Sequence, residues 1–576
     1  MRVAVVAGTG GSALLCELAA DGSRPDNPVH VNDLSAAVAD YERRGQVRWV
    51  WASAAGSYPA LLRAGQRVAR CHDVALAERL LLGRDGQPGG AGQLGGAVTG
   101  PAPDRAASQA AQETLFGPAD DAAPDLPGLL DALVVTHADQ LRRIAADEHP
   151  ARFAMLVAAE SAGGLVAAEM TSAGLPWRAD VHDSLLAGLL GPRPPSVPAG
   201  ARPARLAELA AQIDEAFCGR RVNPDSPAQL IRAFAADGVR VASTRFSVLR
   251  DVDHPAAKLL IEYKELARLH AANGWGWLDS WVSGGRFRPE YVVGGVVSGR
   301  WASRGGGALQ IPKVLRRAVV ADPGWVLVVA DAAQLEPRVL AALAGDRAFA
   351  EAAAGGDLYL ALAGAFGGDR AKAKVALLSA MYGGAGGEAG QLLGVLRRRF
   401  PLASQYVEAA AQAGQEGRVV RSVLGRTCPP PSAGWRALTE ESGDPESSRD
   451  AGAGAASRAR GRFTRNFVVQ ASAADWALVL LAGLRRRLAM ISIPNGDCGA
   501  GSPAQSGDPA GGWAEGPHLV FFQHDEVIVH CPEPVVEPVL AAIREAGEEA
   551  GRLVFGATPV RFPLTTAVVN CYADAK

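Results

Sequence analysis

Residues 519–530 read Leu-Val-Phe-Phe-Gln-His-Asp-Glu-Val-Ile-Val-His, two apolar runs separated by a short polar stretch. β-Branched and aromatic residues on both sides of so short an interruption predict a β-hairpin. The tip would hold His524, Asp525 and Glu526 close together on a rigid support. An ordinary polar turn is the alternative, because polar residues dominate turns.

A second apolar run, Trp325-Val-Leu-Val-Val-Ala-Asp331, also predicts a strand, and it ends in a carboxylate. Helical spacing resumes within the next residues, Ala332-Ala-Gln-Leu-Glu-Pro-Arg338. An acid at the open end of a strand suits a hard cation. The alternative is that Asp331 caps the helix that follows.

Residues 370–382 predict a helix that stops at Gly383. Steps of four residues place Arg370, Lys374, Leu378 and Tyr382 along one face that spans about 18 Å. Cations at one end and an aromatic ring at the other match a triphosphate with its sugar and base. The alternative is a solvated basic face.

Cations also gather in two stretches of a chain whose net charge is only −2, so that any polyanion must bind to local patches. The first stretch contains Arg286, Arg288, Arg300, Arg304, Lys313, Arg316 and Arg317, with Glu290 as its one acid. The second contains Arg458, Arg460, Arg462 and Arg465. Phosphate-backbone binding is the functional interpretation, and solubility is the alternative.

In this order the three elements resemble the motifs of the family A DNA polymerases. Residues 331–338 are similar to the first motif, residues 370–383 to the fingers helix, and His524-Asp525-Glu526 to the third motif. Secondary matches lie at residues 223–230, 298–300, 309–312, 417–426 and 466–475, so the resemblance covers about 151 to 576. Ala332-Ala333, Pro337, Leu378 and Tyr359 depart from the family pattern.

The resemblance implies a role for each matching residue. The catalytic residues would be Asp331, Asp525, Glu526 and Lys374. Two Mg²⁺ ions, for which Mn²⁺ can substitute, would bind Asp331, Asp525 and the backbone carbonyl of Ala332. The nucleotide would contact Arg370, Lys374, Leu378, Tyr382, Glu336 and Gln334, and DNA would contact Arg300, Gln310, Arg426, Gln470 and His524.

The fold class implied is α+β: a right-hand polymerase of palm, fingers and thumb, preceded by an α/β ribonuclease H-like domain of the exonuclease type. We expect that domain at residues 1–150 and the polymerase at 151–576, with the thumb at about 155–285. The palm would span about 286–345 and 518–576, and the fingers about 346–517. Short β-branched runs from Tyr291 onward independently predict an antiparallel sheet with a helical insertion.

The first 150 residues alternate apolar runs at 3–7, 47–51 and 133–135 with helical patterns, which indicates an open α/β unit. The first strand, residues 1–11, has no carboxylate, whereas proofreading exonucleases of the family carry Asp-x-Glu there. We therefore expect a retained fold without proofreading. A dinucleotide-binding turn at Gly8-Thr-Gly10-Gly11 is a weaker alternative.

The implied function is template-directed addition of deoxynucleotides to a primer 3′-hydroxyl, in DNA repair or gap filling. Two other functions stay open: a catalytically weak or inactive DNA-binding scaffold, and a single-subunit polymerase that makes RNA. The implied partners are primer-template DNA and deoxynucleoside triphosphates, with a monomeric protein.

Composition narrows the class further. A hydrophobic fraction of 48% in 576 residues excludes wholesale disorder, and the length allows three or more domains. Seven scattered cysteines predict neither a disulfide framework nor a zinc site. We see no apolar run of membrane-spanning length, and expect a cytoplasmic, nucleoid-associated bacterial protein. Stretches 83–103, 191–203, 429–460 and 494–517 are too rich in small and breaker residues to predict a core.

Overall fold

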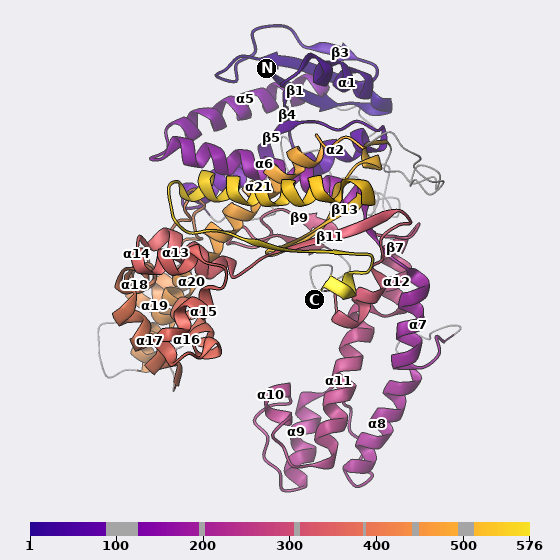
Figure 1. Cartoon of the computed structure of the whole chain (residues 1–576), viewed down its shortest axis with the longest axis vertical. Coiled ribbons are helices and arrows are strands. Elements are labelled where there is room, and N and C mark those ends of the chain that lie inside the picture. Colours follow the sequence, from indigo (N-terminus) through magenta and orange to yellow (C-terminus); the bar gives the residue numbers. More distant parts are fainter. Residues whose placement is uncertain are drawn as a thin grey trace. The chain divides into compact units, whose positions relative to one another are not determined.

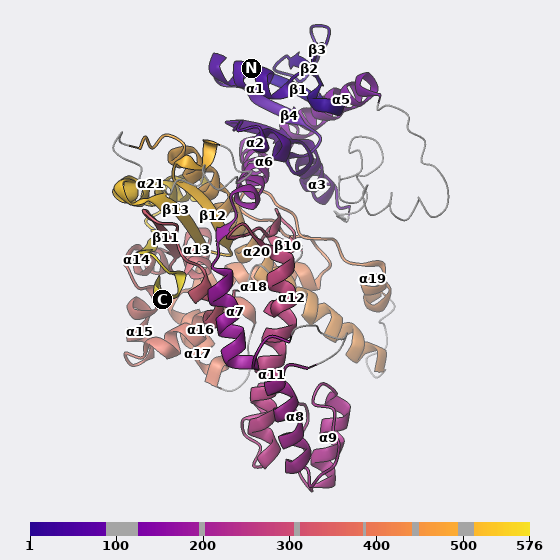
Figure 2. The same cartoon turned by 90° about the vertical axis from the view of Figure 1, so that its right-hand side faces the viewer.

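The computed structural model describes residues 1–87, 125–194, 202–304, 311–383, 388–440, 448–493 and 512–575 (Figures 1 and 2). The chain forms two compact units. The first holds Met1–Ala173, Tyr291–Ala302 and Pro323–Val568, and the second holds Gly174–Glu290, Ser303–Asp322 and Val569–Lys576. Gln310 and most of the stretches 83–103 and 494–517 lie outside the described residues.

A five-stranded sheet in the order β3-β2-β1-β4-β5 fills the amino-terminal part of the first unit. Strand β1 is antiparallel to β2 and parallel to β4, and β4 is parallel to β5. The elements are β1 (Arg2–Ala7), β2 (Ala13–Leu18), β3 (Val29–Val31), α1 (Leu34–Arg44), β4 (Arg48–Trp51), α2 (Ala54–Arg63), β5 (Arg70–Asp73), α3 (Val74–Arg84) and α5 (Leu126–Ala145). The predicted strand at residues 133–135 is wrong, because Leu130, Leu133 and Val134 recur at helical spacing and form the buried face of α5.

The glycine-rich turn Thr9–Gly11 joins β1 to β2. Gly10 and Gly11 have φ values of 65° and 86°, which glycine adopts without steric cost. The chain then runs back antiparallel to β1, whereas a dinucleotide-binding turn leads into a helix. The dinucleotide-binding interpretation of this turn is therefore wrong.

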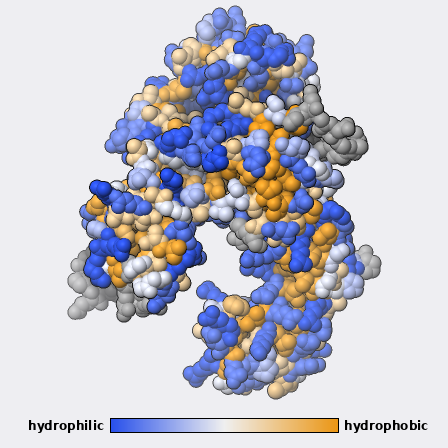
Figure 3. All heavy atoms as spheres, in the orientation of Figure 1, coloured by the Kyte–Doolittle hydropathy of each residue, from blue (hydrophilic) through white to orange (hydrophobic). Residues whose placement is uncertain are grey.

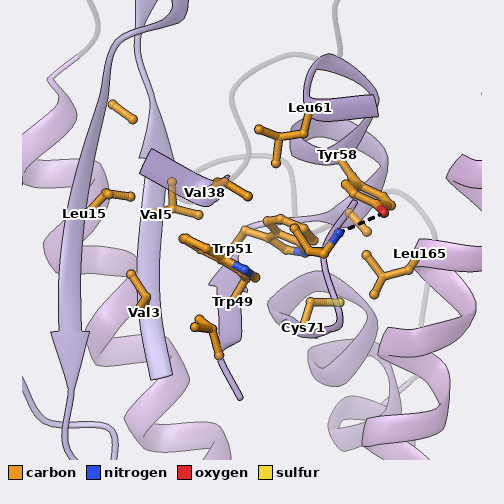
Figure 4. Packing of buried hydrophobic residues seen from close by; sticks show 14 of the residues in the cluster. Val3, Val5, Leu15, Val38, Trp49, Trp51, Tyr58, Leu61, Cys71 and Leu165 are labelled. Carbon is orange, nitrogen blue, oxygen red and sulfur yellow. Dashed lines mark hydrogen bonds between the residues drawn. The ribbon is translucent and has the colours of Figure 1, made fainter. Parts of the chain in front are cut away.

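The amino-terminal core packs on both faces of this sheet. On one face Trp49 and Trp51 of β4 lie among Val5 of β1 and Leu165 of helix α6 (Pro150–Ala173) (Figure 4). The Tyr58 hydroxyl in the same cluster accepts a hydrogen bond from the Val68 N–H at 3.2 Å. Helix α5 covers the opposite face. Helix α6 thus packs against the amino-terminal sheet and also belongs to the rest of the first unit.

Two helices, α6 and the Gly452–Leu488 part of α20 (Ser448–Leu488), are long and apolar enough to cross a membrane by length and composition alone. In the structure, 67% and 89% of their apolar windows are buried, and buried charges such as Glu160 and Arg485 lie along them. Both therefore serve as core helices of the first unit. On the face drawn in Figure 3, hydrophilic side chains are spread between smaller apolar areas.

A four-stranded sheet in the order β12-β13-β11-β14 forms the centre of the first unit. Its strands are β11 (Trp325–Ala332), β12 (His518–Gln523), β13 (Glu526–Pro532) and β14 (Leu564–Val569). Strand β13 is antiparallel to both β11 and β12, which confirms the predicted antiparallel sheet. The helical insertion consists of α13 (Leu335–Ala344), α14 (Arg347–Ala354), α15 (Leu358–Ala363), α16 (Arg370–Tyr382), α17 (Glu388–Arg399), α18 (Pro401–Gln415), α19 (Ala433–Glu440) and α20, and α21 (Val536–Phe555) follows β13.

In the stretch 429–460, where we expected no core, the described residues on either side of 441–447 include helix α19 and the first turns of α20. Its alanines favour helix, and Trp435 gives the segment a buried contact. The Trp435 indole donates to the Ala456 carbonyl at 3.2 Å, and the Arg460 guanidinium lies 5.8 Å from the indole centroid. Small residues here therefore allow close helix packing and do not mark a linker.

The second unit is mostly helical, as its periodicity predicts. It contains α7 (Ala179–Leu190), α8 (Ala204–Ala216), α9 (Pro227–Ala236), α10 (Phe246–Leu249), α11 (Pro255–Asn273) and α12 (Trp275–Trp281), with the small sheet β6 (Leu175–Pro176), β8 (Arg286–Phe287) and β7 (Val282–Ser283). This unit begins at Gly174, and α6 belongs to the first unit.

Candidate active site

The two motif aspartates lie side by side although 194 positions separate them in the sequence numbering. In the β11–β13 ladder Asp331 is the partner of Glu526, and the Ala332 N–H donates to the Asp525 carbonyl at 2.9 Å. Both aspartates are half-buried, whereas Glu526 is 5% exposed. The pairing of β11 with β13, strands that Figure 1 labels, thus brings the two acids to one end of this sheet.

A two-residue loop, His524-Asp525, joins β12 to β13, since Gln523 and Glu526 form the last pair of the hairpin. Of these two residues only His524 has a positive φ, 56°, which is the pattern of a type II′ turn. Glycine usually occupies that position, and histidine there is strained. Burial, followed by the nearby Arg300 guanidinium, lowers the pKa of His524 and favours its neutral form.

The aspartates fit a divalent cation of the Mg²⁺ type. Mg²⁺ binds through one or two carboxylates and takes its other ligands from water and substrate phosphates. Asp331 and Asp525 supply two carboxylates at a partly exposed strand end, and Ala332 follows directly with a backbone carbonyl. Within the described residues no group of three or more His, Cys, Asp and Glu side chains is arranged to hold a metal ion by itself. The donor set therefore suits an ion that shares its coordination with a substrate.

Glu336, in the first turn of α13, links two other predicted residues. The Arg300 guanidinium donates to one carboxylate oxygen of Glu336, and the Tyr382 hydroxyl donates to the other. The Glu336 side chain is 14% exposed, so this ion pair is only partly screened by water. Arg300, from the segment before β11, and Tyr382, at the end of α16, thus meet at the carboxylate of Glu336 on α13.

Helix α16 presents the predicted face to solvent. Arg370, Lys374 and Tyr382 are exposed and Leu378 is half-buried, while Ala373, Ala376, Leu377 and Met381 form the buried face. Asp369 caps the helix by accepting from two backbone N–H groups, and Gly383 ends it with a φ of 78°. The predicted helix and its stop at Gly383 are confirmed.

Arg370 is held by an acid that sequence reasoning missed. Its Nε donates to Asp357 Oδ2 at 2.7 Å, and its guanidinium lies 5.4 Å from the Tyr359 ring centroid. Gln334 donates to Asp357 Oδ1 at 2.8 Å and accepts from the Leu358 N–H at 2.8 Å. Partial burial alone would raise the pKa of Asp357, but these donors lower it to about 2. Asp357 carries only the sequence signal of a helix cap before α15, which does not reveal its charged partner.

Arg426 occupies a structural position. It is 6% exposed, and its guanidinium pairs with Glu160 at 2.8 Å and Asp475 at 3.4 Å. Burial this deep argues against a DNA contact in this conformation, and that assignment stays a prediction. Gln470 is half-buried on α20, Arg300 is engaged by Glu336, and Gln310 lies outside the described residues.

Arg338 is a second residue whose role the motif pattern does not reveal. It is 0% exposed and donates to the carbonyls of Ala353 at 2.6 Å and Arg561 at 2.9 Å. These bonds tie α13, which carries Glu336, to two other segments of the first unit. Two buried glutamates of α6 also form ion pairs with arginines. No local sequence pattern indicates these pairs, because each arginine lies far from its glutamate along the chain.

Comparison with known proteins agrees with this arrangement. The family model for DNA polymerase family A matches residues 201–568. A thermostable DNA polymerase I of Thermus filiformis is 26% identical over 332 residues, which cover 52% of this chain and 34% of that protein. DNA polymerase I of Chloroflexus aurantiacus is 24% identical over 366 residues, covering 58% and 34%. The chain thus spans about a third of the length of these relatives.

A solved structure, the POL domain of Pol1 from M. smegmatis in complex with DNA primer-template and dNTP, is similar over the whole chain. The TM-score is 0.67 at 19% sequence identity, and the match covers 100% of this chain and 95% of that one. This likeness confirms the predicted right-hand fold. At this identity it shows the fold, and the roles of individual residues stay predictions.

Proposed function

The chain belongs to the family A DNA polymerases, and on that premise we propose that it adds deoxynucleotides to a primer 3′-hydroxyl as directed by a template strand. The observation that carries the proposal is the register of β11 and β13, which sets Asp331 beside Asp525 at a partly exposed strand end. Phosphoryl transfer of this kind depends mainly on positioning and on charge stabilisation. Both are properties that two neighbouring acids and the cations of helix α16 would supply.

The two aspartates would hold the divalent ions, with the Ala332 carbonyl as a further ligand. When bound, a pair of Mg²⁺ ions, or of Mn²⁺ as a substitute, activates the attacking hydroxyl and stabilises the leaving pyrophosphate. Glu526, buried at the base of the hairpin, would support the Asp525 loop. His524, kept neutral by burial and by Arg300, would lie against the primer terminus.

Helix α16 would bind the triphosphate through Arg370 and Lys374. Arg370 is held by Asp357 and Tyr359 in this structure, so it must exchange the carboxylate for phosphate when nucleotide binds. Glu336 and Tyr382 would line the sugar, and their hydrogen bond gives that wall a defined position. A wall of this kind disfavours a 2′-hydroxyl, which supports DNA synthesis over RNA synthesis.

The amino-terminal α/β domain would lack proofreading activity. Strand β1, Arg2–Ala7, carries no acid, and Val3, Ala4 and Val5 are buried. The relatives suggest a bacterial protein. We further propose primer-template DNA and deoxynucleoside triphosphates as partners, a monomeric state, a location in the cytoplasm at the nucleoid, and a role in repair or gap filling.

Primer extension tests the proposal directly. The full chain is incubated with a 5′-labelled primer on a longer template, with Mg²⁺, and with either deoxy- or ribonucleotides. We expect extension with deoxynucleotides that a chelator abolishes and Mn²⁺ restores. No extension with either nucleotide would identify a scaffold, and a preference for ribonucleotides would identify an RNA-synthesising enzyme.

The same mixtures without nucleotides test the amino-terminal domain. We expect a single-stranded or 3′-mismatched primer to keep its length in Mg²⁺ and in Mn²⁺. Shortening from the 3′ end that disappears with a chelator would contradict the loss of proofreading, while leaving the polymerase proposal intact.

A further inference from the structure

The loop that presents Arg300 lies on a buried set of ion pairs. The loop comprises residues 293–300, Val-Gly-Gly-Val-Val-Ser-Gly-Arg, and follows β9 (Glu290–Val292). Two of its own backbone bonds hold it together: the Val296 N–H donates to the Arg300 carbonyl at 3.0 Å, and the Gly299 N–H donates to the Val296 carbonyl at 2.8 Å. Val296 and Val297 are exposed, so few buried apolar side chains anchor the middle of this loop.

The buried set consists of Arg79 on α3, Glu160 on α6, Arg426, and Asp475 on α20, and we call it the loop network. Arg79 donates to Glu160 at 2.8 Å, and Arg426 joins Glu160 to Asp475. Glu160 and Asp475 are 0% exposed. The positive and negative charges balance, as buried charges require.

The network contacts the loop at both ends. At the first end, one Arg79 nitrogen donates to the Val293 carbonyl at 2.7 Å as well as to Glu160. A Cβ on Gly294 would lie 2.5 Å from Glu160 Oε1 and 2.6 Å from the same Arg79 nitrogen. Gly294 has a φ of 57°, so glycine is needed here for the backbone conformation and for space.

At the second end Gly299 lies directly against Arg426. A Cβ at this position would collide with Nε and Cζ of the Arg426 guanidinium, and Gly299 has a φ of 85°. The next residue is Arg300, whose side chain pairs with Glu336. The glycine that lies against Arg426 and the arginine that pairs with Glu336 are thus adjacent in the sequence.

We propose that the loop network is a positioning device, in which the amino-terminal domain, through Arg79, holds the loop 293–300 so that Arg300 meets Glu336, to which Tyr382 also donates. Arg79 and Arg426 act here as positioning residues, because each contacts the loop or its glycines and pairs with Glu160. The consequence for function rests on the proposed polymerase activity: the network sets how strictly the site rejects ribonucleotides. It also gives a domain without the expected nuclease acids a reason to be retained.

A second buried set on the same helices provides a matched control. Arg67 binds Glu169 at 2.9 and 3.0 Å, and Arg485 of α20 completes this set with Tyr58. Glu169 lies nine residues after Glu160 on α6. The side chains of Arg67 and Arg79 are each 21% exposed, and both come from the amino-terminal domain. Arg67→Gln should therefore disturb the structure as Arg79→Gln does, at a site that does not hold the loop.

Hydrogen–deuterium exchange of the full-length variants tests the positioning itself without any need for activity. We expect exchange in the peptide 293–302 to accelerate about tenfold or more in Arg79→Gln and to stay near wild type in Arg67→Gln, because only Arg79 anchors the loop. Arg79→Lys, which can still donate to Glu160 and Val293, should restore protection. Equal protection of this peptide in wild type and Arg79→Gln would overturn the proposal.

Nucleotide selectivity tests the consequence. The ratio of kcat/KM for deoxy- over ribonucleotides should fall by about fivefold or more in Arg79→Gln, since small displacements near reacting groups have large effects. Arg67→Gln should change it less than about twofold at a temperature where both variants are folded. Arg300→Ala should lower the ratio on its own, and adding Arg79→Gln to it should lower the ratio no further. Additive losses, or the same loss in Arg67→Gln, would contradict positioning through Arg300.

The two possible failures are distinct. A wild-type chain that extends no primer refutes the polymerase proposal, whatever the exchange data show. A wild-type chain that extends primers, combined with unchanged loop protection and selectivity in Arg79→Gln, refutes the positioning device alone.

Discussion

Asp331 and Asp73 both lie at the carboxyl end of a strand that a helix follows, yet the structure uses them in opposite ways. Asp73, at the end of β5, is 2% exposed; it caps α3 through the Leu76 N–H at 2.9 Å and accepts from the Ala54 N–H at 2.7 Å. Asp331, at the end of β11, is half-buried, and the N-cap of the following helix α13 is Gln334. An acid at the end of a strand is thus a structural group in one sheet and a candidate ligand in the other.

The difference comes from what surrounds each strand end. The Asp73 backbone N–H donates to Ser161 Oγ of α6 at 3.1 Å, and α6 covers this end of the sheet. Burial raises the pKa of Asp73 to about 6. At the central sheet the neighbouring hairpin instead brings a second acid, Asp525, next to Asp331. A strand-end acid that a helix covers serves as a helix cap, whereas a strand-end acid beside a second, partly exposed acid suits the binding of a cation.

Asp331→Asn gives the largest expected effect. We expect kcat for primer extension to fall by at least about 100-fold, because a bound metal ion contributes several kcal/mol of transition-state stabilisation. Single-nucleotide incorporation measures this rate, and Asp525→Asn should behave alike. The thermal unfolding midpoint should stay near wild type, since Asp331 does not cap α13. A folded Asp331→Asn variant with wild-type kcat would contradict the assignment.

Asp73→Ala should show the opposite profile. We expect the free energy of unfolding to fall by about 1–3 kcal/mol, because the α3 cap is lost and the Ala54 N–H is left buried without its acceptor. Denaturant unfolding measures this change. At a temperature where the variant is folded, kcat should stay within about twofold of wild type. A large loss of kcat without loss of stability would show that both strand-end acids serve chemistry.

The pH dependence of stability sharpens the contrast. The folded pKa of Asp73, about 6, lies above the unfolded value of about 3.9, so the folded state binds the extra proton and loses stability as pH rises from about 4 to 6. Asp73→Asn removes this pH-dependent loss of stability, because asparagine does not ionise. We expect its unfolding midpoint, relative to wild type, to rise by about 2–4 °C between pH 4 and 7.

The quantity to compare is the difference in unfolding midpoint between wild type and Asp73→Asn, because His72 and His137 titrate in both proteins. Burial lowers the pKa values of His72 and His137 to about 4 and about 3, which removes stability as pH falls and opposes Asp73. A midpoint difference that does not change with pH would mean that Asp73 ionises normally in the folded state.

Leu378→Phe gives the smallest expected effect and tests the proposed nucleotide-binding face of α16. An aromatic ring at this half-buried position should stack on the nucleotide and add about 1 kcal/mol of binding, which lowers the apparent nucleotide KM about fivefold. Steady-state incorporation with varied nucleotide measures it, and kcat should change little. Leu377→Phe on the buried face of α16 is the matched control, which should destabilise without lowering KM.

Local sequence predicted the elements of the candidate site well. The strand ending at Asp331, the hairpin around His524 and the helix stopped at Gly383 all lie where their patterns indicate. These features depend on neighbouring residues: alternation along a strand, helical periodicity, and the left-handed conformation that glycine adopts. The right-hand fold followed from the order of the motifs, because three spaced motifs are far more specific than any one of them.

Other assignments needed the folded chain. Arg426 matches a DNA-contacting position of the motif, yet it is enclosed by Glu160 and Asp475. Asp357 matches only a helix cap, yet it holds Arg370. In both cases the partner lies in a distant segment, and side-chain types alone do not indicate which cation an acid will meet.

The amino-acid sequence by itself determined the strand that carries Asp331, the hairpin around His524 and the helix that ends at Gly383, because these depend on interactions between near neighbours. Only the tertiary structure decided which acids meet and which are covered, since strand register and helix packing join residues hundreds of positions apart. Burial then settles the chemistry of each group: removal from water raises the pKa of Asp73, whereas a partly exposed strand end leaves Asp331 beside Asp525.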